Sequence, residues 1–154
     1  MQKEIDMGLD MYLTKSIFVG AEYEHMKVTG KIEIFQDGKP LKVNLNKVSS
    51  IEEQTGYWRK ANAIHKWFVD NVQNGVDECQ TSYVSSDKLL ELLDLVNKVL
   101  SDHSLAEQLL PTSSGFFFGN YDYDEWYLNN LENTKQILEF ALSEPGEYYY
   151  RASW

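Results

Sequence analysis

The sequence has only one cysteine, no long apolar run and fewer basic than acidic residues. Because Cys79 is the sole cysteine of 154 residues, a disulfide within the chain is excluded. No run of about 18 apolar residues could span a bilayer. The segment from Met1 to Asp6 also lacks the apolar stretch of a signal peptide. We therefore expect a cytoplasmic protein.

The charge is unevenly distributed along the chain. Lys and Arg number 14 against 24 Asp and Glu, a net charge of -10. Residues 1–75 carry ten of each sign, so the excess lies wholly in residues 76–154. Affinity for nucleic acid comes mostly from clustered Lys and Arg, and we expect no direct nucleic-acid binding. The acidic half is either a solvated surface or a face that imitates nucleic acid, and Arg59 and Lys60 leave room for a local anion site.

Known catalytic signatures are missing as well. The chain contains no Walker-type loop, no dinucleotide-binding glycine pattern and no nucleophile elbow. His25, His65 and His103 occur singly, without the second ligand three or four residues away that zinc sites use. Asp122, Asp124 and Glu125 either hold a hard cation or cap a helix, and capping needs no further assumption. We assign no catalytic residue, no metal and no cofactor.

Hydrophobic residues make up 43% and charged residues 25% of the chain, as in a single soluble domain spanning residues 1–154. Alternating polarity predicts strands over 9–14, 31–36 and 41–46. Asp37 and Gly38 join the last two as an antiparallel hairpin, and a strand over 23–29 precedes them.

Capping residues and 3.6-residue spacing predict helices in the rest of the chain. They cover 51–74 (capped by Ser49 or Ser50), 86–100 (capped by Ser85 or Ser86), 102–110 and 123–143. Short strands are expected over 80–84, 115–119 and 147–154. This order predicts an α+β fold, a mainly antiparallel sheet with about three to four helices packed on one face.

The segment from Tyr57 to Phe68 concentrates groups that can stack on a base, clamp a phosphate and read a base edge. Trp58 supplies an aromatic plane and Arg59 a guanidinium. Asn62 and His65 follow at helical spacing as hydrogen-bonding groups. The alternative is a structural helix whose aromatics fill a groove beside the sheet, with His65 bonded to a backbone carbonyl.

Aromatic residues make up 14% of the chain and gather again at 121–127 and 148–154. A core this small cannot hide all of Trp58, Trp126 and Trp154, so some should be exposed. An exposed aromatic beside polar groups suits a ligand pocket or a protein interface.

Several segments resemble a family of small uncharacterised proteins of tailed bacteriophages and prophages. They are Met7 to Leu13, Tyr57 to Phe68, Leu109 to Thr112 with Gly115 to Gly119, Tyr123 to Tyr127, and Tyr149 to Trp154. If the family begins at Met7, residues 1–6 are an upstream extension or an alternative start. The resemblance implies a phage setting in a bacterial host and accessory roles such as evasion of host defence. It transfers no catalytic residues.

We therefore expect a non-enzymatic binder that sequesters a small nucleotide-like ligand or blocks a host defence protein. Its binding residues are expected to come from the first strand, the long helix and the last helix: Asp10, Tyr12, Trp58, Arg59, Asn62, His65, Glu125 and Tyr127. One alternative is a nucleotide-directed enzyme with His65 as general base, oriented by Asp10 or Glu125. Another is an acidic mimic that binds a host DNA-binding protein. No membrane partner is expected, and a homo-oligomer is left open.

Overall fold

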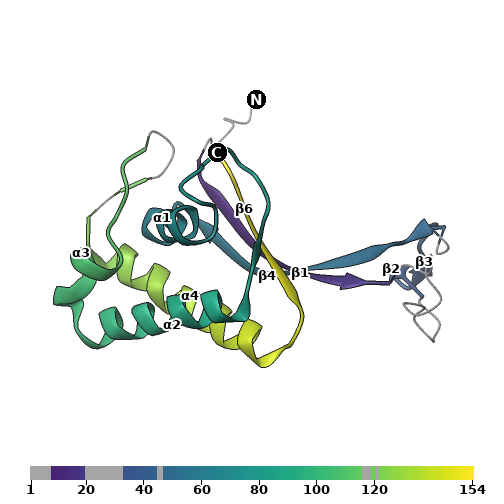
Figure 1. Ribbon diagram of the computed structural model, residues 1–154. Helices are drawn as coiled ribbons and strands as arrows, with labels where there is room; N and C mark the ends of the chain where they lie inside the picture. The colour runs from purple at the N-terminus through teal and green to yellow at the C-terminus, as the bar shows by residue number, and fades with distance from the viewer. Residues whose placement is uncertain (1–7, 20–32, 45–46, 116–118, 121) are drawn as a thin grey trace.

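The computed structural model describes residues 8–19, 33–44, 47–115, 119–120 and 122–154. Within these ranges the chain forms an α+β fold in which the helices lie on one side of a four-stranded sheet (Figure 1). The elements are β1 (Asp10–Phe18), β2 (Phe35–Gln36), β3 (Lys39–Pro40), β4 (Ser50–Arg59), α1 (Asn62–Asn71), β5 (Ser82–Val84), α2 (Ser86–Ser101), the 3₁₀ helix η3 (His103–Leu105), α3 (Ala106–Leu109), α4 (Glu125–Ser143) and β6 (Glu147–Ser153).

The four-stranded sheet has the order β4-β1-β6-β5, and every neighbouring pair is antiparallel. Strand residues alternate between the helix side and the opposite side. Met11 and Leu13 of β1 are therefore buried, whereas Asp10 and Tyr12 lie on the open face. The register between β1 and β4 shifts at Leu13/Thr14.

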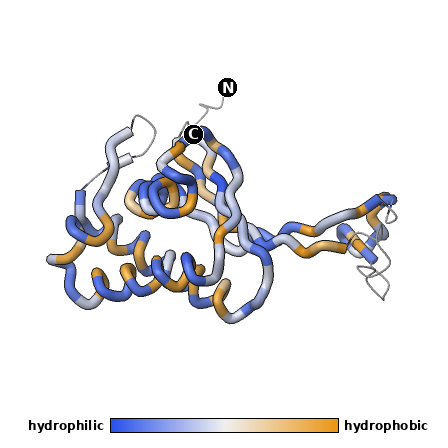
Figure 2. The backbone as a smooth tube through the Cα atoms, viewed as in Figure 1, coloured by the Kyte–Doolittle hydropathy of each residue, from blue (hydrophilic) through white to orange (hydrophobic). Residues whose placement is uncertain are grey.

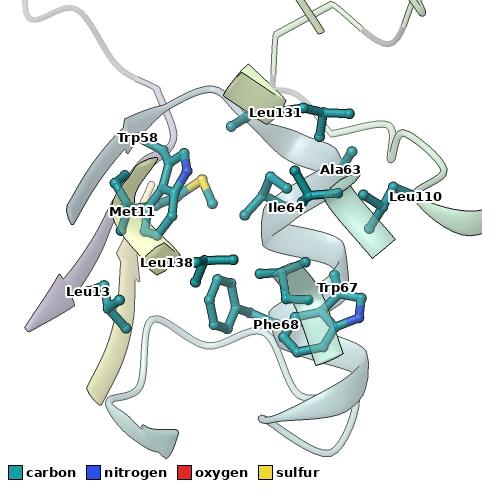
Figure 3. Packing of buried hydrophobic residues seen from close by; sticks show 14 of the residues in the cluster. Met11, Leu13, Trp58, Ala63, Ile64, Trp67, Phe68, Leu110, Leu131 and Leu138 are labelled. Atoms are coloured by element: carbon teal, nitrogen blue, oxygen red, sulfur yellow. The ribbon is translucent and has the colours of Figure 1, made fainter. Parts of the chain in front are cut away.

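Apolar side chains from the sheet and the helices form one core. Figure 3 shows Trp58 of β4 and Met11 of β1 facing Ile64 and Phe68 of α1, with Leu138 of α4 among them. α2 and α4 close this layer with faces that include Leu89, Leu92, Val96, Leu131 and Ala141. Residue 56 must be glycine for α4 to lie this close to β4, because a Cβ there would come within 2.4 Å of Ile137.

The helix predicted over residues 51–74 is wrong in its first half. Residues 50–59 are strand β4, paired with β1 along its whole length, and α1 begins only at Asn62. Neither Ser49 nor Ser50 caps a helix, because Ser50 is the first residue of β4. The capping-box spacing is a local signal, and strand pairing with the distant residues 10–18 overrides it.

Several elements whose signals are local were predicted correctly. Ser85 caps α2, Asp102 caps η3 and Asp124 caps α4, each by accepting a backbone N–H. β5 and β6 lie within the predicted ranges. The predicted strand over 23–29 and residues 116–118 of the strand predicted over 115–119 lie outside the described residues.

A two-stranded ribbon leaves the body of the protein. β1 pairs with β6 only as far as Ser16, and beyond it pairs with β4 alone. The ribbon continues to the Val19 amide, which donates to the Ser49 carbonyl at 2.8 Å. β2 and β3 lie at its far end, away from the helices (Figure 1). The predicted Asp37-Gly38 turn is there, with positive φ at both residues. The strand predicted over 41–46 is wrong in its described part, because residues 41–44 form no strand and β3 is Lys39–Pro40 instead.

Among the described residues no helix is long and apolar enough to cross a membrane.

Candidate functional site

The expected binding residues do not form one site, because they lie in four separate places: the open sheet face, a pocket, the core and the exposed start of α4. Asp10, Tyr12 and Arg59 lie together on the open face of the sheet. Asn62 and Tyr127 line a pocket at the amino end of α1. Trp58 and His65 are buried, and Glu125 is exposed in the first turn of α4.

On the open sheet face, a charged pair links neighbouring strands. Arg59 Nη1 lies 2.7 Å from Asp10 Oδ1, and the Tyr57 hydroxyl donates to the same carboxylate. The ring centroids of Tyr57 and Tyr12 are 5.5 Å apart. The Arg151 guanidinium carbon lies 4.6 Å from the centroid of the Tyr12 ring, so the four side chains form a row across the strands. The row is a cross-strand cluster in which tyrosine rings and guanidinium groups contact each other.

The pKa of the Asp10 carboxyl reflects these neighbours. Partial burial raises this pKa, but hydrogen bonds from Tyr57 and Arg59 and the positive charges of Arg59 and Lys60 outweigh it. The pKa therefore lies below its ordinary value. The same hydrogen bond to Asp10 raises the pKa of Tyr57. Asp10 is thus held as a carboxylate that balances two cations.

The pocket lies between the amino end of α1, the start of α4 and the loop that precedes α4. Its lining is mixed polar and aromatic: Lys60, Ala61, Asn62, Ala63, Ile64, Thr112, Asn120, Asp122, Trp126, Tyr127, Asn130 and Leu131. Three segments that the sequence analysis singled out meet here, since residues 57–68, 109–112 and 123–127 all contribute to the walls.

The position of Lys60 is set by two glycines. Its side chain passes so close that a Cβ on Gly8 would come within 2.6 Å of Lys60 Cε, and one on Gly119 within 3.1 Å of Lys60 Cβ. The Lys60 backbone has a φ of 52°, in the left-handed region, and its amide donates to the Leu9 carbonyl at 2.7 Å. A non-glycine residue is strained in this conformation, and such strain concentrates at functional sites.

Asn62 and Tyr127 hold the walls of the pocket rather than reaching into open space. The Asn62 side chain donates to the Asn120 carbonyl at 2.8 Å and accepts from the Ser113 amide at 3.0 Å. The Tyr127 hydroxyl donates to the Leu110 carbonyl at 2.7 Å, and burial raises the pKa of Tyr127. Both residues tie the loop segments around α3 to the helices.

Trp58 cannot stack on a ligand as expected. Its side chain is 1% exposed, packs edge-on against Phe68 and donates from Nε1 to the Thr134 hydroxyl at 2.8 Å. The alternation of β4 sends Trp58 into the core and its neighbours Tyr57 and Arg59 to the opposite face. Arg59 and Asn62 therefore do not share a helix face.

His65 has two side-chain partners, neither of which was anticipated. Its Nδ1 lies 2.6 Å from the Tyr150 hydroxyl and its Nε2 lies 2.9 Å from Asp77 Oδ2, whose other oxygen accepts from the Trp154 indole. Burial raises the pKa of Tyr150 well above its ordinary value. Asp77, and not Asp10 or Glu125, therefore orients this imidazole.

Among the acidic residues near the start of α4, the Asp124 side chain caps the helix. Asp124 Oδ1 accepts from the Tyr127 amide at 3.1 Å, and Asp122 donates its backbone amide to the Asn120 side chain at 2.9 Å. Within the described ranges, no group of three or more His, Cys, Asp or Glu side chains could hold a metal ion.

Two lining residues of the pocket, Lys60 and Trp126, were not among the expected binding residues, although the sequence indicated a local anion site at Arg59 and Lys60 and an exposed aromatic among the tryptophans. Trp126 was expected to be exposed with other tryptophans, and it is 50% exposed, as Trp154 is at 44%. Lys60 is marked by the close approach of Gly8 and Gly119 to its side chain. These three residues are far apart in the sequence, so the close approach could not be predicted from it. Comparisons with protein-family models, curated proteins and solved structures found no match to this chain.

Proposed function

We propose that this protein is a non-enzymatic binder that holds a small nucleotide-like ligand at the mouth of the pocket at the amino end of α1, whose inner space of about 10 Å³ admits only one small group of the ligand, and that it serves as an accessory protein of a phage or prophage. The observation that carries the proposal is that one pocket is lined by the cationic side chain of Lys60, the first turn of α1 and the half-exposed ring of Trp126.

Two of these features favour an anionic group on the ligand. Lys60 lines the pocket next to the first turn of α1, where the positive end of the helix dipole lies. The N-cap residue is Ala61, which has no side chain to accept a hydrogen bond, and the first turn contains no acidic residue. A phosphate group fits this combination of a cation and a helix amino end.

The other features favour a planar, hydrogen-bonding group. The Trp126 ring can stack on a base. The amide side chains of Asn120 and Asn130 supply donors and acceptors for a base edge, and Asp122 can accept from an amino or hydroxyl group. The Asp122 carboxylate repels a ligand of high negative charge, so the charge of the pocket lining favours a nucleotide with a single phosphate, or a cyclic one, over a triphosphate.

The position of His65 supports binding rather than catalysis at the pocket. His65, the imidazole considered as a general base, is buried between Tyr150 and Asp77 and does not line the pocket. A general base must be within hydrogen-bonding distance of the proton that it removes. This placement favours a binder over the nucleotide-directed enzyme.

Isothermal titration calorimetry with nucleoside monophosphates, cyclic mononucleotides and cyclic dinucleotides tests the proposal. We expect binding of at least one of them, weakened at least tenfold by Trp126→Ala and by Lys60→Gly. Trp154→Ala is the matched control, because Trp154 has a similar exposure and does not line the pocket. The absence of heat with every compound, or equal loss in the control, would overturn the proposal.

Chromatography of the ligand after incubation separates binding from catalysis. A binder returns the ligand unchanged after many hours at an equal concentration of protein. Products that accumulate in proportion to the protein would instead identify an enzyme. The two outcomes are independent of affinity, so they distinguish the functions even for a weak ligand.

A further inference from the structure

A hollow of about 330 Å³ lies between the start of α2 and the end of α4. Its walls come from the first residues of α2, from the last turn of α4 with the turn that follows it, and from Tyr148 of β6. All of these segments belong to the described part of the chain. Pockets that bind small molecules typically have volumes of roughly 300–1,000 Å³, so the hollow can hold a small organic molecule.

The floor of the hollow is apolar and reaches the core. Leu89 of α2, Ala141 of α4 and Tyr148 of β6 line it and are all buried. Leu142 and Pro145 extend the apolar wall and are more exposed. Figure 2 shows hydrophobic and hydrophilic positions alternating along α2 and the last turns of α4. The apolar body of a ligand would therefore leave water and contact core side chains.

The charge beside the hollow is negative. Glu144, the C-cap residue of α4, lines the hollow, and its carboxylate lies 3.4 Å from Lys15 Nζ. Burial raises the pKa of Tyr148, Lys15 lowers it, and Glu144 and Glu53 raise it further, so these three charges lie near the Tyr148 ring. The two carboxylates and the one ammonium group sum to a net negative charge.

The two helix ends at the hollow strengthen this preference for a cation. The carboxyl end of α4 is the negative end of its helix dipole, and its last turn contains no basic residue. The amino end of α2 is positive, but the Ser85 side chain caps it and Asp87 lies in its first turn. The helix end that lacks a compensating charge of its own is therefore that of α4.

We propose that the hollow binds a small organic cation, an ammonium group carried on an apolar body. The ammonium group lies at Glu144 and the carboxyl end of α4, and the body packs against Leu89, Ala141 and Tyr148. The lining combines polar and apolar groups, which suits an amphipathic molecule better than a purely apolar one. An anion of the same size is disfavoured because it would meet the Glu144 carboxylate.

Two-dimensional NMR of the full chain with 2-phenylethylammonium tests the proposal. We expect amide signals of residues 86–89 and 141–148 to shift, with a dissociation constant of about one millimolar or tighter. 2-Phenylethanol and phenylacetate have similar size and carry a neutral and an anionic group in place of the cation. They should bind about fivefold and about tenfold more weakly, respectively. Equal binding of the three compounds, or no shift at these residues with the ammonium, would overturn the proposal.

Two substitutions of opposite effect test the position of the ammonium group. Glu144→Gln should weaken binding of 2-phenylethylammonium about fivefold and leave binding of 2-phenylethanol unchanged, because it removes the charge and keeps the shape. Lys15→Met should strengthen binding of the ammonium, because it removes the cation that competes for Glu144 and keeps a side chain of similar length. The amide spectrum shows whether each variant retains its fold.

Glu139→Gln is the matched control for these variants. Glu139 is an exposed glutamate of α4 that does not line the hollow, so its variant should bind 2-phenylethylammonium like the wild type. Equal loss in the control, unchanged binding by Glu144→Gln, or weaker binding by Lys15→Met would contradict a cation site at Glu144.

The hollow and the nucleotide pocket can fail independently. The pocket lies at the amino end of α4 and the hollow at its carboxyl end. Glu144→Gln should therefore leave nucleotide affinity at the wild-type value.

Discussion

The indole nitrogen of Trp58 donates a hydrogen bond to the hydroxyl of Thr134, 2.8 Å away, and so ties β4 to α4 inside the core. The Thr134 hydroxyl in turn donates to the Asn130 carbonyl one helical turn earlier at 2.6 Å. Thr134 has no measurable exposure and Trp58 is 1% exposed, so water cannot replace either partner. This contact joins the sheet to the helix layer.

Thr134→Val should destabilise the protein by about 1–3 kcal/mol, because it leaves the buried indole N–H without an acceptor. Valine has nearly the shape of threonine, so the change in packing is small. Thr134→Ser keeps the hydroxyl and loses one methyl group, and serves as the matched control. Urea unfolding followed by tryptophan fluorescence measures both. A valine variant as stable as the serine variant would show that the hydrogen bond contributes little.

His65→Ala should destabilise the fold by about 2–4 kcal/mol, because it creates a buried cavity and removes the partner of the Tyr150 hydroxyl. His103→Ala is the control, since His103 is exposed on η3 and should change stability by less than about 0.5 kcal/mol. Nucleotide affinity of the His65 variant at low temperature should equal that of the wild type. Loss of binding without loss of stability would return His65 to the binding site.

The α+β class and most helices could be predicted from the sequence because their signals lie within the helices themselves. Ser85 and Asp124 cap α2 and α4 as their spacing indicates, and the apolar faces of these helices are buried. Strand β4 could not be predicted in this way. Its apolar and polar residues fit a helix locally, and only pairing with β1, about forty residues earlier, decides between the two.

The candidate site could be predicted only in part, because strand β4 was interpreted as helix. Reading residues 57–68 as one helix placed Trp58, Arg59, Asn62 and His65 on one surface, whereas the strand-to-helix change at Lys60 sends them to different sides of the sheet. Three of the segments that the sequence analysis singled out line the pocket. The geometry between them depends on contacts that are far apart in the sequence.

Asp10→Asn should lower the free energy of unfolding at neutral pH but not at acidic pH. The pKa of Asp10 is lower in the folded protein than its ordinary value of 3.8. Its stabilising effect is therefore present above that value and is lost as the pH falls through the folded pKa. At pH 7 the variant should be less stable than the wild type by about 0.5–1 kcal/mol, as for a partly exposed ion pair.

Urea unfolding at pH 7, 5 and 3 measures this difference, which should stay constant to pH 5 and shrink below about pH 4. Arg59→Gln separates the ion pair from other effects of the asparagine. The coupling energy in a double-mutant cycle of Asp10 and Arg59 should be present at pH 7 and small at pH 3. A difference that does not change with pH would show that Asp10 acts by packing alone.

Lys60→Gly should leave stability nearly unchanged and weaken nucleotide binding at least tenfold. Glycine adopts the φ of 52° without strain, a gain that offsets the larger entropy of the unfolded chain to within about 1 kcal/mol. Lys60→Ala removes the same ammonium group but keeps the strained backbone, so it should be less stable than Lys60→Gly by about 1 kcal/mol. Both variants should bind nucleotide equally poorly if the ammonium group carries the affinity. If the alanine variant kept wild-type affinity, the pocket would not use Lys60 to bind an anion. If Lys60→Gly keeps the stability but loses the affinity, the strained left-handed backbone at residue 60 serves to place a lysine side chain in the pocket.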